Sequence, residues 1–128
     1  MFGFIKIKYM ELNNLAVSIY EANKKKGFWD EKRNVGEMLM LVTTELAEAL
    51  EAHRKFRFAN LSDADKNDSI EDESFFTSFV KDTFEDEIAD AIIRLFDMAG
   101  GLNIDLDYHI SAKLHYNSNR PYKHGKNY

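Results

Sequence analysis

The chain has 128 residues, of which 45% are hydrophobic and 13% aromatic, and its 17 Lys and Arg against 22 Asp and Glu give a net charge of −5. This length and apolar content can supply a core, which excludes wholesale disorder and favours a single domain over residues 1–128. The chain lacks cysteine, which excludes disulfides, thiolate zinc sites and cysteine nucleophiles. Any metal must therefore be held by oxygen or imidazole ligands.

Hydrophobic segments are too short for a membrane-spanning helix. The longest uninterrupted aliphatic run is Met38–Val42, far below the ~20 residues that a span requires. Lys6 and Lys8 interrupt the apolar N-terminal residues, and no small-residue cleavage site follows them. We therefore expect a cytoplasmic protein without a membrane partner.

The charged residues are unevenly distributed along the chain. Residues 60–90 contain eleven Asp and Glu against two Lys, whereas residues 113–128 contain four cations and no acid. This basic segment is too small to neutralise many phosphates of a nucleic-acid polymer, so we expect no such partner. A few cations beside many carboxylates suit a small phosphorylated ligand bound together with a divalent metal.

The spacing of apolar residues predicts an all-α protein with four main helices. Apolar residues recur at intervals of three and four over about residues 10–26, 34–56, 75–99 and 105–116. Asn34, with Glu37 three positions later, is a typical helix N-cap. Gly27 is expected to end the first helix, and Gly100 with Gly101 the third. The segment 57–74 has no period and is predicted to be an acidic loop, and residues 117–128 form a basic tail.

Two pairs of carboxylates lie on inward helix faces. In a helical projection Glu45 occupies the middle of an apolar stripe, and Glu48 lies about 60° away at its border. Glu87 and Asp90 repeat this arrangement on the third predicted helix. Ionised carboxylates rarely face a core without a partner, because their desolvation costs several kcal/mol. The two pairs predict divalent cations between the helices, and all-oxygen ligands suit Mg²⁺, with Mn²⁺ as an alternative.

Acidic residues can also face a core as ion pairs or as ligands of other metals. Arg94 shares the helix face of Glu87, so a salt bridge is the main alternative to a metal for an inward carboxylate. A di-iron bundle requires Glu-x-x-His motifs, and no histidine here has Glu three residues before it. The run Asp63-x-Asp65-x-Asn67 imitates the start of a calcium-binding loop, but the required glycine and final glutamate are missing, which favours a solvated loop.

The order of the motifs resembles a known family. Thr44–Glu48 (TELAE) followed by Glu87–Asp90 (EIAD) is similar to the E-E-x-x-E and E-x-x-D motifs of the MazG-like, all-α nucleoside triphosphate pyrophosphohydrolases. Three further stretches agree with this family: Gly27–Asp30, Ala89–Arg94 with Asp97, and Lys113–Lys126. The match spans nearly the whole chain in order. The chain departs from the family pattern at Thr44, which replaces the first Glu, and in the long interval between the two motifs.

The resemblance implies a bundle of four to five helices that assembles as a homodimer or homotetramer. It implies Mg²⁺-dependent hydrolysis of an NTP or dNTP to the monophosphate and pyrophosphate, as in house-cleaning of the nucleotide pool. Carried over by motif, the metal ligands and catalytic carboxylates would be Glu45, Glu48, Glu87 and Asp90. Any of the four could also act as the general base, and the less constrained Glu48 is one candidate.

Residues outside the acidic motifs are candidates for substrate binding. Lys113, Arg120 and Lys126 can supply cations for the phosphates, and Asn117 can bind a phosphate or a sugar hydroxyl. Trp29 can stack on a nucleobase. The alternatives are a solvated tail, an asparagine that caps the fourth helix, and a tryptophan that packs in the core.

Two other classes of function remain open. The chain could be a non-catalytic helical module that binds nucleotides or partner proteins, or a structural bundle that dimerises. Helices two and three also carry a second apolar arc beside the acidic stripe, which predicts at least a homodimer. This arc consists of Leu39, Leu46, Leu50, Ile88 and Ile92.

Overall fold

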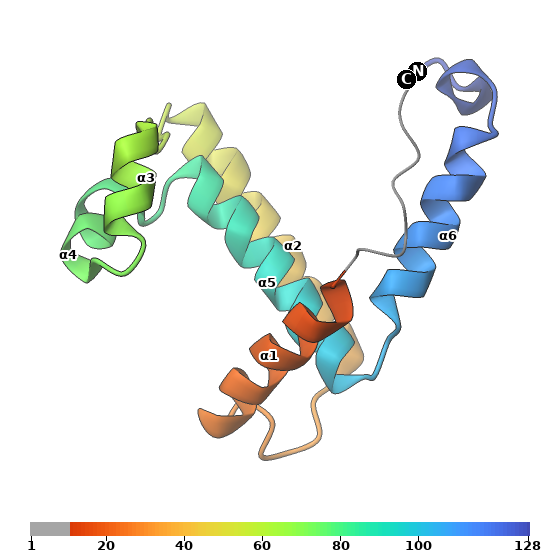
Figure 1. Cartoon of the computed structure of the whole chain (residues 1–128), viewed down its shortest axis with the longest axis horizontal. Helices are drawn as coiled ribbons and strands as arrows, with labels where there is room; N and C mark the ends of the chain where they lie inside the picture. Colours follow the sequence, from red (N-terminus) through yellow and green to blue (C-terminus); the bar gives the residue numbers. More distant parts are fainter. Residues whose placement is uncertain (1–10) are drawn as a thin grey trace. The chain divides into compact units, whose positions relative to one another are not determined.

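A computed structural model describes residues 11–128, so the N-terminal residues that include Lys6 and Lys8 lie outside the described part of the chain. All regular structure in the described residues is helical (Figure 1), which confirms the all-α prediction. None of these helices is long and apolar enough to cross a membrane. The elements are α1 (Leu12–Lys25), α2 (Val35–Arg54), α3 (Asp63–Ser69), α4 (Glu73–Phe75), the π-helical turn η2 (Phe76–Val80), α5 (Phe84–Gly101), α6 (Leu106–Ser118) and the 3₁₀ turn η3 (Tyr122–Gly125).

The chain divides into two compact units, and α5 runs from one into the other. The central unit is Trp29–Leu95, and the terminal unit contains the residues up to Phe28 together with Phe96–Tyr128. All four predicted metal ligands lie in the central unit. The predicted phosphate-binding residues of the tail lie in the terminal unit.

Within the central unit, α2 and α5 lie side by side (Figure 1). α2 begins as predicted, because the Asn34 side chain accepts a hydrogen bond from the Glu37 backbone N–H at 3.0 Å. The backbone N–H of Phe84, at the start of α5, donates to the carbonyl of Arg57 at 2.8 Å. The predicted stripe on α2 is also confirmed, since its buried residues recur every three or four positions: Met38, Val42, Glu45, Ala49 and Ala52.

The prediction of a loop over residues 57–74 is wrong for the central part of the segment. Residues Asp63–Ser69 form α3, although no residue of this helix is buried. The helix is stabilised by a capping box: Asp65 N–H donates to Ser62 Oγ, and Ser62 N–H donates to Asp65 Oδ2, both at 3.1 Å. Polar capping therefore supports a helix where hydrophobic periodicity gives no signal.

The predicted continuous helix over residues 75–99 is interrupted. Its first part is the short α4 and the turn η2, and α5 begins only at Phe84. In the break, Asp82 adopts a positive φ of 63°, and its N–H donates to Asp86 Oδ2 at 2.9 Å. The Asp86 N–H donates to Thr83 Oγ1 at 3.3 Å. These local polar bonds start a new helix and end the preceding turn.

The terminal unit is held together by polar contacts between α1 and the start of α6. Leu12 N–H donates to Asp107 Oδ1 at 2.9 Å, and the Asn13 amide donates to Asp105 Oδ1 at 2.8 Å. Asp105 also caps α6, because the same oxygen accepts from Tyr108 N–H at 3.0 Å. The predicted fourth helix is thereby confirmed and extends two residues further, to Ser118.

The glycine pair at the end of α5 does not terminate the helix as predicted. Asn103 provides the left-handed residue (φ 57°), while its N–H and that of Ile104 donate to the carbonyls of Gly100 and Ala99. Gly100 serves close packing instead. A Cβ at this position would lie 2.5 Å from the carbonyl oxygen of Ala16 on α1.

Candidate metal centre

Three of the four predicted carboxylates converge in the central unit. Glu45 from α2 and Glu87 with Asp90 from α5 each place one carboxylate oxygen within 4.8 Å of the others. Glu45 and Glu87 are only 7% and 6% exposed, and Asp90 is half-buried. The convergence follows from their inward positions on two neighbouring helices. This group could hold a metal ion.

Glu48 borders the group. Its side chain is exposed, as expected from its place at the edge of the apolar stripe, and it lies close enough to Glu45 and Glu87 to shift the pKa of both. All four predicted carboxylates therefore belong to one connected cluster, which we call the carboxylate cluster. The structure thus brings the two acidic motifs together.

Two members of the cluster have an abnormally high affinity for protons. Burial, the hydrogen bond and charge of Glu48, and the charge of Asp90 raise the pKa of Glu87 to about 7. Burial and the charges of Asp86 and Glu45 raise the pKa of Asp90 above its ordinary value. Glu87 and Asp90 thus experience neighbouring carboxylates as repulsive, a situation that a bound cation would reverse.

Arg94 pairs with one carboxylate of the cluster. Its Nε donates to Glu45 Oε1 at 2.6 Å. Burial alone would raise the pKa of Glu45, but the hydrogen bond and charge of Arg94, with the hydrogen bond of Glu48, lower it below the ordinary value. The salt bridge expected as the alternative to a metal is therefore present. One guanidinium balances only one of four carboxylates, so it does not replace a metal.

Two further acids adjoin the carboxylate cluster, and the helical projection did not predict them. Oxygens of Asp82, Asp86 and Glu87 also lie within 4.8 Å of one another. Glu87 belongs to both groups and therefore connects them. Asp82 is additionally paired with Lys81 at 2.9 Å. A signal was present in the sequence, because Asp82, Asp86 and Asp90 follow one another at intervals of four.

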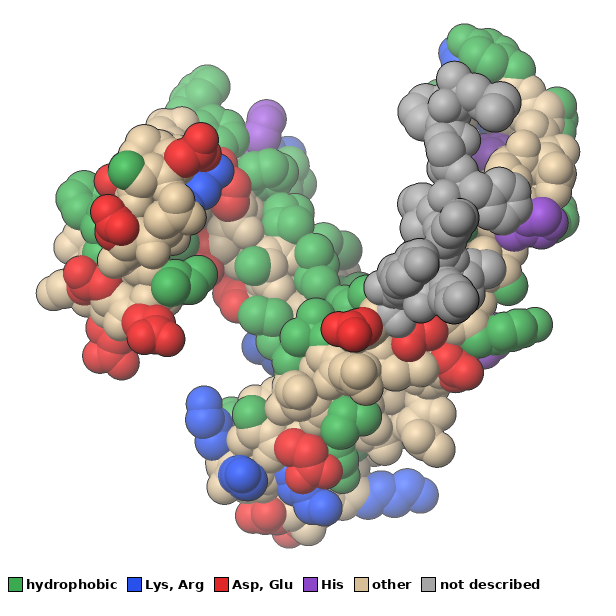
Figure 2. All heavy atoms as spheres, in the orientation of Figure 1, with side chains coloured by type: hydrophobic (Ala, Val, Ile, Leu, Met, Phe, Trp, Pro, Cys, Tyr) green, Lys and Arg blue, Asp and Glu red, His purple; other side chains and the backbone are tan. Residues whose placement is uncertain are grey.

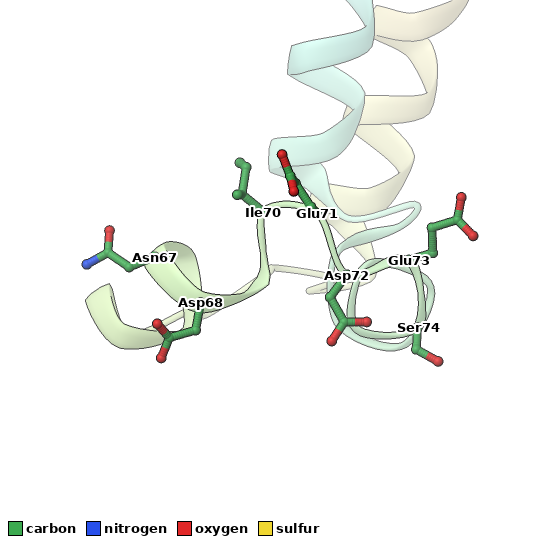
Figure 3. A pocket seen from close by; sticks show the side chains of 7 residues that line it. All are labelled: Asn67, Asp68, Ile70, Glu71, Asp72, Glu73 and Ser74. Carbon is green, nitrogen blue, oxygen red and sulfur yellow. The ribbon is translucent and has the colours of Figure 1, made fainter.

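The acidic segment around α3 and α4 presents a different surface. Figure 2 shows acidic side chains gathered over these elements. A wide hollow of about 840 Å³ lies here. Figure 3 shows side chains that line it, with Glu71 and Glu73 pointing away from Asp68 and Asp72. Among the described residues these carboxylates form no converging group. Asp63 and Asp65 lie in a helix, which agrees with the rejection of a calcium loop.

Two of the predicted phosphate-binding residues lie beside Tyr116 in the terminal unit. Lys113 Nζ and Arg120 Cζ lie 5.1 and 5.6 Å from the centre of this ring. Asn117 lies within α6, where its Oδ1 is buried without a hydrogen-bond partner among residues 11–128, and Asn119 occupies the helix end instead. Lys126 follows η3 and is exposed.

Trp29 belongs to the central unit and is half-buried. The guanidinium of Arg33 lies 5.1 Å from the centre of its ring, as in a cation–π contact. One ring surface is thus engaged within the chain. This contact accounts for part of the burial of Trp29.

Comparison of the chain with protein-family models, with curated proteins and with solved structures found no match. Over residues 11–128 the fold and the site define an all-helical protein with a carboxylate cluster that could hold a metal ion.

Proposed function

We propose that the chain is a Mg²⁺-dependent nucleoside triphosphate pyrophosphohydrolase of the MazG-like, all-α type. The observation that carries this proposal is the convergence of Glu45, Glu87 and Asp90 from two helices. The two motifs that resemble this family are 39 positions apart (87 − 48) in the sequence, yet their carboxylates lie together. The proposed substrate is an NTP or dNTP, and the proposed role is house-cleaning of the nucleotide pool in the cytoplasm.

The donor set fits a hard divalent cation. It contains only carboxylate oxygens, which Mg²⁺ and Mn²⁺ prefer. Burial of Glu45 and Glu87 is costly without a counter-charge, and the raised pKa of Glu87 reflects this cost. Arg94 supplies one positive charge, which leaves a surplus of negative charge for a metal to balance.

In the proposed reaction, the residues of the carboxylate cluster have different roles. When bound, a divalent cation would neutralise phosphate charge and acidify a water molecule. Glu45, Glu87 and Asp90 would hold it, while the exposed Glu48 would accept the proton of the attacking water. The water oxygen bonds to phosphorus as the bridging bond to pyrophosphate breaks, which yields the monophosphate.

Residues of the terminal unit are the proposed phosphate-binding groups. Lys113 and Arg120 present two charges near the ring of Tyr116, and Lys126 is exposed. Asn117 is the proposed partner of a phosphate or a sugar hydroxyl. Trp29 is the proposed residue for stacking on a nucleobase.

The proposed assembly is a homodimer or homotetramer. The second apolar arc on α2 and α5 is largely exposed: Leu39, Leu46, Leu50 and Ile92 retain 48%, 50%, 51% and 47% of their surface. Apolar residues with this exposure on adjacent helices favour burial against a second copy in a larger bundle.

One observation favours a second candidate function, a non-catalytic module that binds nucleotides or partners. Thr44 replaces the first Glu of the family motif, and its Oγ1 donates to the carbonyl of Leu41 in its own helix at 2.7 Å. Thr44 is exposed, and it lacks the carboxylate that the family motif has at this position. A missing ligand of this kind would lower or abolish catalysis while the fold persists.

A pyrophosphate-release assay over the eight common NTPs and dNTPs with Mg²⁺ separates these functions. The enzyme should produce monophosphate and pyrophosphate, and EDTA or Glu87→Gln should abolish the activity. Glu51→Gln is the matched control, because Glu51 lies on α2 outside the cluster and pairs with Lys55. Diphosphate with inorganic phosphate would contradict the assignment. Nucleotide binding without hydrolysis would support the non-catalytic module.

A further inference from the structure

Arg94 is the one described basic residue that hydrogen-bonds to the carboxylate cluster. It lies on α5, one turn after Asp90, and its Nε donates to Oε1 of Glu45 on α2. The Glu45 side chain is 10% exposed, whereas 40% of the Arg94 side chain is exposed. The ion pair therefore has a buried end at the carboxylate and an accessible end at the guanidinium.

The guanidinium retains unused hydrogen-bond donors. An arginine side chain has five N–H groups, of which Nε carries one. Within residues 11–128 the only hydrogen bond of the guanidinium is the one from Nε to Glu45. The four N–H groups of the terminal nitrogens are thus available to a ligand that approaches beside Glu45.

The fork geometry of arginine matches such a ligand. A guanidinium can bind two acceptors at once, and it binds phosphate oxygens in bidentate fashion, which the ammonium of lysine cannot do. Glu45 is both the partner of Arg94 and one of the residues that would hold the cation. A phosphate bound by that cation would therefore approach the Glu45–Arg94 pair.

We propose that Arg94 is a substrate-binding residue that contacts the phosphate chain of the nucleotide, and that Glu45 holds its guanidinium in place for this contact. This inference rests on the proposed function and adds to it a residue that determines substrate specificity. Because the contact is to a phosphate chain, Arg94 selects for triphosphates over monophosphates. The salt bridge then serves the same site as the metal and does not compete with it.

The test measures binding rather than turnover. Titration calorimetry with Mn²⁺ alone, with a non-hydrolysable nucleoside triphosphate analogue and with the monophosphate is performed on the wild type, Arg94→Gln and Arg94→Lys. Arg54→Gln is the matched control, because Arg54 is an exposed residue in the last turn of α2. We expect Arg94→Gln to weaken binding of the triphosphate roughly 10- to 100-fold, the effect of losing charge-assisted hydrogen bonds. Monophosphate affinity should change much less, and Mn²⁺ affinity should not fall.

Equal triphosphate affinity in Arg94→Gln and the wild type would overturn the inference while leaving the proposed function intact. A parallel loss of Mn²⁺ and nucleotide affinity would also overturn it, because Arg94 would then act only by positioning Glu45. If Arg94→Gln does not fold, Arg94→Lys decides: the charge remains but the fork is lost, so at least a roughly tenfold weaker triphosphate affinity is expected, and unchanged affinity contradicts the inference. A wild type that binds neither Mn²⁺ nor the analogue would refute the proposed function itself.

Discussion

Glu45 on α2 and Glu87 on α5 are both buried, yet each places a carboxylate oxygen within 4.8 Å of the other. Carboxylates at this separation repel each other when both are ionised, which favours proton binding. In the absence of a cation, burial and the neighbouring carboxylates raise the pKa of Glu87 to about 7, which favours a proton on this group. Metal binding should displace it, and this competition has measurable consequences.

Divalent metal should stabilise the folded protein. Mg²⁺ or Mn²⁺ binds the carboxylate cluster only when Glu45, Glu87 and Asp90 are assembled, so binding shifts the equilibrium toward the folded state. At a concentration about 100 times Kd, the melting temperature should rise by roughly 10 °C for a chain of this size. Differential scanning fluorimetry with and without EDTA measures this. Indifference to millimolar Mg²⁺, together with tighter metal binding by Glu87→Gln, would mean that the cluster is only an Arg94 salt bridge.

Stability without metal should fall as the pH rises. The pKa of Glu87 is about 7 in the folded protein, against an ordinary value of 4.5. Between these values the folded state binds more protons than the unfolded state, so stability present below pH 4.5 is lost as the pH rises toward 7. The raised pKa of Asp90, next to Asp86, Glu45 and Arg94, acts in the same direction.

Melting temperatures in EDTA should therefore decrease from about pH 5 to about pH 7.5 in the wild type. Glu87→Gln should flatten this dependence, whereas the control Glu51→Gln should retain it. Glu45 acts oppositely, because its lowered pKa makes stability fall at pH values below its ordinary 4.5, so the comparison is made above that value. A wild-type profile that rises over this interval would contradict the raised pKa of Glu87.

The basic tail should serve substrate binding rather than folding. α6 ends at Ser118, and η3 beyond it contains no buried residue. Deletion of residues 119–128 should raise KM at least about tenfold, since Arg120 and Lys126 are lost, while the melting temperature should change little. Steady-state kinetics and thermal melts check both parts. Unfolding of the truncated protein would assign the tail to packing.

Gly100→Ala should destabilise the terminal unit even though alanine is the better helix former by about 1 kcal/mol. The added Cβ would lie 2.5 Å from the Ala16 carbonyl oxygen and 2.7 Å from Tyr20 Cβ. The helices must separate, at a cost of about 1–3 kcal/mol. Urea unfolding measures the change, with Ala22→Val at an exposed position of α1 as the control. Greater stability of Gly100→Ala would contradict the close approach.

The assembly prediction concerns the second apolar arc. Sedimentation at micromolar concentration should give at least a dimer, and Leu46→Glu combined with Leu50→Glu should shift it toward monomer, because a charge at a buried interface is costly. Asp63→Asn, on the exposed α3, is the control. A wild type with the mass of one chain would contradict the predicted dimer.

Much of the carboxylate cluster could be predicted from local sequence alone. The period of an α-helix is a property of each segment, so the burial of Glu45 and Glu87 beside Met38, Ala49 and Ala91 follows from residue spacing. The N-cap at Asn34 is equally local. The all-α class follows from the same periodicity and from the scarcity of Gly and Pro.

The spacing of apolar residues does not predict side-chain hydrogen bonds or the register between helices. The Ser62 capping box and the break at Asp82 depend on side chain–backbone bonds that compete with the apolar pattern. The choice of Glu45 as the partner of Arg94 depends on how α2 and α5 are aligned across their contact. Periodicity within one helix carries no information about that alignment. Only the packed structure decides which inward charges meet.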